Sequence, residues 1–141
     1  MTNLPRGIRN NNPLNLRRSS TKWLGKSANP TDPAFEQFAT MTLGVRAGIL
    51  NMLNHIRASN RALTVPTLAW EVSKWAPASE NNTAAYIENV CKLSLLRPET
   101  ILRVDDRDTI TRLVRAMIYV ENGQHIDFDI IQRAYTLASQ S

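Results

Sequence analysis

The fold is expected to form around one amphipathic segment, Thr109-Ile-Thr-Arg-Leu-Val-Arg-Ala-Met-Ile-Tyr-Val-Glu121-Asn122-Gly123. Its apolar residues recur at helical spacing, which predicts a helix with one buried face. These residues are Ile110, Leu113, Val114, Met117 and Ile118. Asp108 can cap the start of this helix, and Gly123 stands where a helix usually ends.

Glu121 continues this apolar stripe, because it lies four residues after Met117 and seven after Val114. A carboxylate on a buried face is costly unless the protein uses it. Burial and the negative end of the helix dipole both disfavour the charged form. A carboxylic acid that stays protonated near neutral pH is what a glycosidase needs as its general acid. The ordinary alternative is a solvated glutamate in a frayed last turn.

Length and composition favour a single domain without cofactors. The 141 residues are enough for a hydrophobic core. Cys91 is the only cysteine, which excludes an internal disulfide and a cysteine metal cluster. His55 and His125 are too few to suggest a metal site, so neither a metal nor an organic cofactor is expected. No apolar run approaches membrane-spanning length, so we expect no stable membrane association. We also expect the protein to be a monomer.

The net charge of +5 is concentrated near the N-terminus. The first 26 residues contain no acidic residue but several basic ones, namely Arg6, Arg9, Arg17, Arg18, Lys22 and Lys26. Such a surface suits an anionic partner, either a nucleic acid or an acidic cell-wall polymer. A solvated basic face without a specific partner is the alternative.

The remaining chain predicts an α+β, mostly helical domain over residues 1–141. A small β lobe is expected at about 8–40, with short strands near 14–17, 21–24 and 35–38 and no convincing helix. A helical body is expected at about 43–139. The first of its helices should cover 43–58, with Thr42 as cap, and the second should run from about Thr64 to Trp75. A third should begin at about Thr83. The helix that contains Glu121 follows, and a last helix should begin at about Asp127.

Several short motifs occur in an order that resembles lysozyme-like peptidoglycan glycosidases, including bacterial glucosaminidases and small phage-encoded proteins. They are Arg9-Asn-Asn-Asn-Pro-Leu-Asn-Leu-Arg17, Trp23-Leu-Gly25, Phe35-x-x-Phe38, Gly44-Val-Arg-Ala47 and Asn82-Thr-Ala-Ala-Tyr86. Leu14 stands where this resemblance leads us to expect a glycine. The segment Ala116-Met-Ile-Tyr-Val-Glu-Asn-Gly123 looks like the catalytic helix end, which in that family precedes the β region. We therefore predict a circularly permuted lysozyme-like domain, a change that neighbouring chain ends make tolerable.

The resemblance implies cleavage of the glycan strand of bacterial peptidoglycan, as a muramidase, lytic transglycosylase or glucosaminidase, with Glu121 as general acid. A second carboxylate could come from Glu36 or Glu80; otherwise Glu121 would act first as acid and then as base, as in lytic transglycosylases. Sugar-binding groups are expected among Asn12, Asn15, Trp23, Thr83 and Tyr86, with Trp75 as a further aromatic face. For both tryptophans, core packing is the alternative.

The resemblance also indicates where the protein is expected to act and which other functions compete with the enzyme. The N-terminus has no apolar signal region, which predicts an endolysin in the host cytoplasm before release to the cell wall, or a virion-associated protein. The chief rival is a non-catalytic virion or wall-binding protein with the same fold. A nucleic-acid binder is a weaker alternative, and we expect no such partner, because the sequence has no recognisable helix-turn-helix or aromatic stacking motif.

Overall fold

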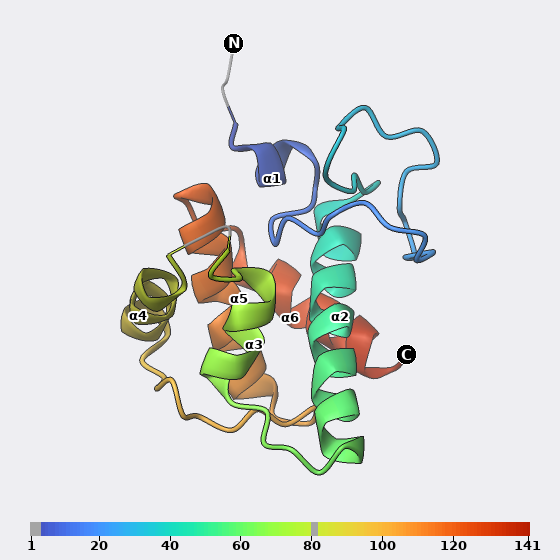
Figure 1. The fold of residues 1–141 in the computed structure, drawn as a ribbon. Helices are drawn as coiled ribbons and strands as arrows, with labels where there is room; N and C mark the ends of the chain where they lie inside the picture. The colour runs from blue at the N-terminus through green and yellow to red at the C-terminus, as the bar shows by residue number, and fades with distance from the viewer. Residues whose placement is uncertain (1–3, 80–81) are drawn as a thin grey trace.

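The computed structural model describes residues 4–79 and 82–141 and is mostly helical within them, as predicted (Figure 1). The described residues form α1 (Arg6–Arg9), α2 (Met41–Arg61), α3 (Leu68–Trp75), α4 (Thr83–Ser94), α5 (Arg107–Asn122) and α6 (Phe128–Ser139). Among them, no helix is both long and apolar enough to cross a membrane.

Side-chain caps set where the helices begin. The cap of α2 is Thr40 and that of α5 is Asp106, each two residues before the predicted cap. Both side chains accept a hydrogen bond from the backbone N–H three residues on, which satisfies a free donor of the first turn. The predicted end of α5 is confirmed, because Gly123 adopts a left-handed conformation with φ 71°.

The N-terminal segment is an irregular lobe rather than the predicted β lobe. In its described part, pairing is limited to isolated bridges, Arg17 with Phe35 and Lys26 with Phe38. The buried amide of Asn12 replaces a strand ladder, because it donates to the carbonyls of Leu16 and Glu36 and accepts from the Leu16 N–H. The lobe also contains the single helical turn α1, which the sequence did not predict.

Leu14 joins this lobe to the helical body. It is 2% exposed and belongs to the main hydrophobic core. It lies so close to Gly48 of α2 that a Cβ at position 48 would come within 2.4 Å of the leucine Cδ1. A glycine at position 14 would permit a positive φ, but in this turn positive φ occurs at Asn11 and Asn15, at 52° and 53°. Asparagine tolerates this conformation better than most residues, so the turn needs no glycine at position 14.

The helical body buries the stripe on α5 as predicted. All five of its apolar residues, Ile110, Leu113, Val114, Met117 and Ile118, are 0% exposed. The long helix α2 packs chiefly against α6, and α4 packs against α5. A smaller cluster of Leu16, Phe38 and Ala47 lies under the N-terminal lobe. Together these contacts bring the lobe against the C-terminal end of α5 (Figure 1).

Candidate functional site

Glu121 lies in the last turn of α5 and is partly buried. Its Oε1 accepts a hydrogen bond from Asn15 Nδ2 at 2.8 Å, across 106 positions of sequence. The structure therefore places Glu121 against the N-terminal lobe and beside one of the two predicted asparagines. The contact orients the carboxyl group.

Asn122 holds the end of α5 against the same loop. Its buried amide donates to the carbonyl of Pro13 at 2.8 Å and to that of Ile118 at 2.9 Å. Helix α1 closes over this junction at Gly7, where an added Cβ would lie 2.6 Å from Asn122 Oδ1 and 2.9 Å from Asn15 Oδ1. Glycine at position 7 thus allows α1, the Asn15 loop and α5 to meet.

Tyr86 of α4 lies close to Glu121. The ring is 9% exposed, and its hydroxyl has no hydrogen-bond partner among the described residues. Burial raises the pKa of the Tyr86 hydroxyl well above its ordinary value, and the charge of Glu121 raises it further. Tyr86 is therefore a neutral phenol whose O–H lies near the carboxylate of Glu121.

Unpaired polar atoms gather at this junction. Four buried side-chain polar atoms lack a hydrogen-bond partner in the described protein, and three belong to Asn15, Tyr86 and Asn122. The two amide oxygens face Gly7, as described above, whereas the Tyr86 hydroxyl is next to Glu121. An unsatisfied buried polar group costs about 1–3 kcal/mol, so their concentration marks the site as one not built for stability alone.

A groove of about 390 Å³ lies between the lobe and the helical body. Asn15 and Arg17 line it from the lobe, Asn51 and His55 from α2, and Trp75 and Pro77 from the end of α3. Glu121 itself is not among the lining residues. Asn15 connects the two features, because it lines the groove and binds the glutamate.

Two predicted site residues have structural roles instead. Asn12 is 0% exposed, and its amide is used entirely within the lobe. Glu36 is 1% exposed and pairs with Lys26 Nζ at 2.9 Å, while the Ser19 N–H donates to the same oxygen. In the structure both residues hold the lobe together, and their roles in sugar binding and catalysis stay predictions.

The remaining predicted residues are separated from Glu121 or tied down. Trp23 packs against the cluster under the lobe, in agreement with core packing. The Thr83 hydroxyl donates to the Ala76 carbonyl and so fixes the loop before α4. Glu80 lies outside the described residues. Of the predicted set, the structure brings together Glu121, Asn15 and Tyr86.

The crowded basic residues at the N-terminus are partly compensated within the lobe. Arg6 makes two hydrogen bonds to Asp32, at 2.6 and 2.7 Å, and Arg18 donates to the Asp32 carbonyl. Contact with Arg6 and further hydrogen bonds from the lobe hold the pKa of Asp32 well below its usual range. Much of the predicted anion-binding surface is therefore structural.

The sequence argument missed the buried pair formed by Glu71 and His55. Glu71 is 0% exposed, and its Oε2 lies 2.7 Å from His55 Nδ1 and 2.7 Å from Trp75 Nε1. The spacing argument used for Glu121 also applies to Glu71, which lies between the buried Leu68 and Val72 on one helical face. That signal could have identified it.

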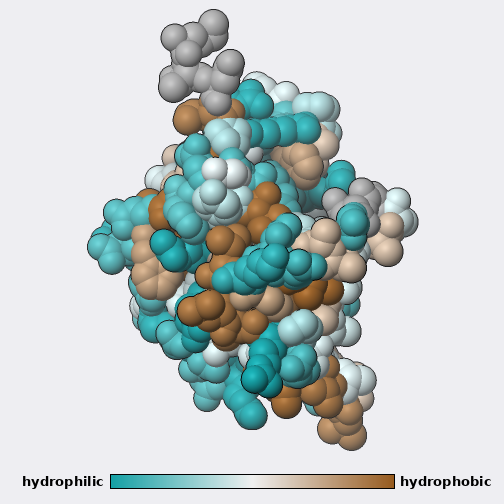
Figure 2. Space-filling view, turned by 90° about the vertical axis from the view of Figure 1, so that its left-hand side faces the viewer, coloured by the Kyte–Doolittle hydropathy of each residue, from teal (hydrophilic) through white to brown (hydrophobic). Residues whose placement is uncertain are grey.

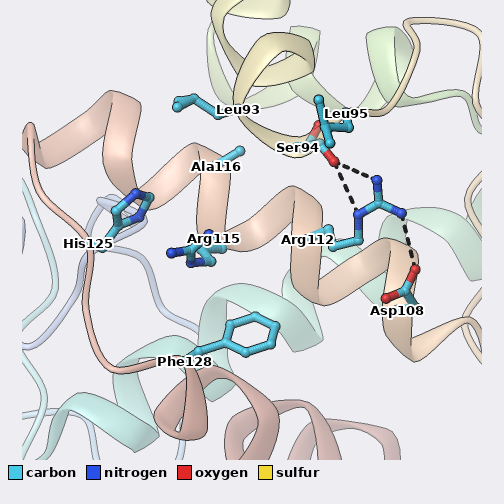
Figure 3. Close-up of a pocket in the computed structure, with 9 residues that line it drawn as sticks. All are labelled: Leu93, Ser94, Leu95, Asp108, Arg112, Arg115, Ala116, His125 and Phe128. Carbon is cyan, nitrogen blue, oxygen red and sulfur yellow. Dashed lines mark hydrogen bonds and ion pairs between the residues drawn. The ribbon is translucent and has the colours of Figure 1, made fainter.

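A second hollow, of about 410 Å³, lies among α4, α5 and α6 (Figure 3). Arg112 is tied to the Ser94 carbonyl and to Asp108, while Arg115 lies over the Phe128 ring. Burial and the charge of Arg115 lower the pKa of His125 here. Figure 2 looks onto the side of the molecule that carries α4 and shows apolar patches among hydrophilic residues.

Comparison with known proteins gives one relationship and no assigned activity. No protein-family model matches the chain. Protein P5 of Pseudoalteromonas phage PM2 is 32% identical over 135 residues, which cover 92% of this chain and 79% of the phage protein. This chain belongs to the family of protein P5. The relationship connects the chain to phage proteins, while the name P5 states no activity.

Proposed function

We propose that this protein is a lysozyme-like phage enzyme that cleaves the glycan strand of peptidoglycan, with Glu121 as general acid. The observation that carries the proposal is the meeting of Glu121, Asn15 and Tyr86 from three distant segments beside a groove. The resemblance of the ordered motifs supports the same reaction, and the phage relative is consistent with it.

In this proposal, Asn15 orients the acid. Its N–H donates to Glu121 Oε1, so Oε2 is the oxygen that carries the proton to the glycosidic oxygen. As the proton leaves, negative charge develops on the carboxylate. The neutral Tyr86 hydroxyl is then a nearby donor for that charge, which favours proton transfer. Glu36 takes no part, because Lys26 and Ser19 occupy its carboxylate.

The circular permutation is part of the same proposal. Helix α5, near the C-terminal end of the chain, meets the loop at residues 13–15, near the N-terminal end. In a permuted lysozyme-like domain, the catalytic helix end and the substrate loop must meet although they exchange their order along the chain. The contacts of Asn122 and Glu121 with this loop supply that meeting.

The direct test is digestion of purified peptidoglycan by the purified protein. Zymography should show clearing, and mass spectrometry of the released fragments should identify the bond and distinguish hydrolysed from 1,6-anhydro ends. The variant Glu121→Gln should show no clearing. Absence of cleavage by the folded wild-type protein would exclude the enzyme proposal.

A non-catalytic virion or wall-binding protein is the second candidate function. The hollow among α4, α5 and α6 favours it, because exposed apolar side chains line it, including Leu93, Leu95 and Phe128 at 41%, 82% and 37% exposure. Sedimentation with intact peptidoglycan in the absence of cleavage would support this alternative.

A further inference from the structure

The least explained polar group in the molecule is Glu71 of α3. Its carboxylate is 0% exposed, takes no part in the mechanism above, and has one oxygen, Oε1, without a partner among the described residues. Replacing a whole buried ion pair by well-packed apolar residues is often neutral or stabilising, so stability alone does not explain a carboxylate at this position. Glu71 therefore requires an explanation other than packing.

The Glu71 carboxylate has two hydrogen-bond partners, and both are ring nitrogens of residues that line the groove. His55 Nδ1 lies 2.7 Å from Glu71 Oε2, and the Trp75 indole N–H donates to the same oxygen at 2.7 Å. The indole nitrogen can only donate. Two donors converging on one oxygen fit an ionised Glu71, so the shared proton belongs on His55 Nδ1.

This arrangement determines which side of the histidine faces the groove. Nδ1 points to a fully buried carboxylate, yet the His55 side chain is 28% exposed and lines the groove. The accessible nitrogen is therefore Nε2, which carries the lone pair in a neutral ring protonated on Nδ1. In many enzymes a histidine acts as general base while a buried carboxylate fixes its tautomer and its orientation.

We propose that His55, held by Glu71, is the general base of the groove and activates water, so that cleavage is hydrolytic and inverts the anomeric configuration. The inference rests on the proposed function of Glu121. Asn15 places the two groups at one site, because it binds Glu121 and shares the groove with His55. Glu71 acts through His55 and is a positioning residue.

The proposed step moves two protons and exchanges one bond at the anomeric carbon. One O–H proton of water passes to His55 Nε2 while the water oxygen forms a bond to the anomeric carbon. The bond from that carbon to the glycosidic oxygen breaks, and its electron pair takes the proton of Glu121. The products are two hydroxyl-ended sugars, an imidazolium and a carboxylate, and solvent exchange restores both protein groups. Attack from the face opposite the leaving oxygen gives inversion.

The first experiment determines the configuration of the product. The wild-type protein is mixed with soluble, uncross-linked glycan strands, and ¹H NMR records the new reducing end before mutarotation. An inverted anomer supports the proposal. A retained anomer or a 1,6-anhydro end overturns it and leaves Glu121 as the acid. Absence of any cleavage overturns both this inference and the proposed function.

The second experiment uses chemical rescue. His55→Ala should lower kcat by about 10²–10⁴-fold, the range for a lost general base. Azide needs no base, so it should restore turnover and yield a glycosyl azide of inverted configuration, with Glu121 still protonating the leaving oxygen. If His55→Ala lowers activity without rescue by azide, or leaves activity unchanged, the proposal is wrong. His55→Gln provides a second variant of similar size should the alanine variant fold poorly.

Glu71→Gln tests the positioning role. The neutral amide no longer holds the proton on His55 Nδ1, so kcat should fall at least tenfold with KM nearly unchanged, and azide should again restore turnover. A merely structural role would lower the folded fraction and would not respond to azide. Glu88→Gln, an exposed glutamate of α4 paired with Lys92, is the matched control and should leave kcat unchanged.

Discussion

Glu121 and Glu71 both continue apolar helical stripes but differ in what surrounds them. Glu121 lies in the last turn of α5, is partly buried and accepts a hydrogen bond from Asn15. Glu71 lies within α3, is fully buried and binds two ring nitrogens through one oxygen. The last turn of a helix keeps a route to the surface, which is why we propose that Glu121, and not Glu71, gives its proton to a substrate. A glutamate buried in mid-helix can act only through its neighbours.

The largest expected effect is on turnover in Glu121→Gln. The amide keeps an oxygen that accepts from Asn15 but cannot deliver a proton, so the cleavage rate should fall by about 10²–10⁴-fold. Stability should be unchanged or slightly higher. The checks are rate measurement on glycan strands and urea denaturation. Glu88→Gln, an exposed glutamate paired with Lys92, is the matched control. Full activity in Glu121→Gln would mean that the wrong glutamate had been chosen.

The next effect is on stability in Glu71→Ala. Removing the carboxylate leaves the buried N–H groups of Trp75 and His55 without an acceptor, and the loss should be about 2 kcal/mol after the relief of the buried charge. Urea denaturation measures it. Glu88→Ala should stay within about 0.5 kcal/mol of the wild type. If Glu71→Ala and Glu88→Ala change the free energy of unfolding equally, the buried contacts of Glu71 do not stabilise the fold.

A smaller effect is expected in Tyr86→Phe. Its hydroxyl is buried without a partner in the described protein, so removing it should leave the free energy of unfolding unchanged or slightly higher. Turnover should fall by about tenfold, as expected for one weakened contact to developing charge. Parallel rate and denaturation measurements test this. A variant that unfolds, with its remaining folded fraction fully active, would show that Tyr86 serves only the core.

The smallest effect concerns the pH dependence of the N-terminal lobe. The pKa of Asp32 is depressed by Arg6 in the folded state, so the unfolded chain takes up the proton first as pH falls. The stability from this pair is complete above the unfolded pKa of about 3.9 and is lost progressively below it. The Asp32→Asn variant should therefore have a lower free energy of unfolding than the wild type at pH 7. This difference should be smaller at pH 3, and urea denaturation at the two pH values measures it. A gap independent of pH would contradict this.

Sequence alone identified the features that depend on local spacing. The stripe of α5, the glycine at its end, and the starts of α4 and α6 follow from helical periodicity and turn chemistry. The same pattern selected Glu121. The predicted strands failed because the lobe is held by side-chain amides such as Asn12, and an amide that replaces a ladder hydrogen bond has no periodic signature.

Only the tertiary structure decided which polar residues act together. Asn15 and Asn12 are three positions apart, yet one faces Glu121 and the other is enclosed within the lobe. Glu36 and Glu71 are both buried, yet one pairs with Lys26 in the lobe and the other orients a histidine at the groove. Spacing determines the face of a helix that a residue occupies. It does not determine the neighbour across a long-range contact, because that neighbour depends on how the whole chain packs.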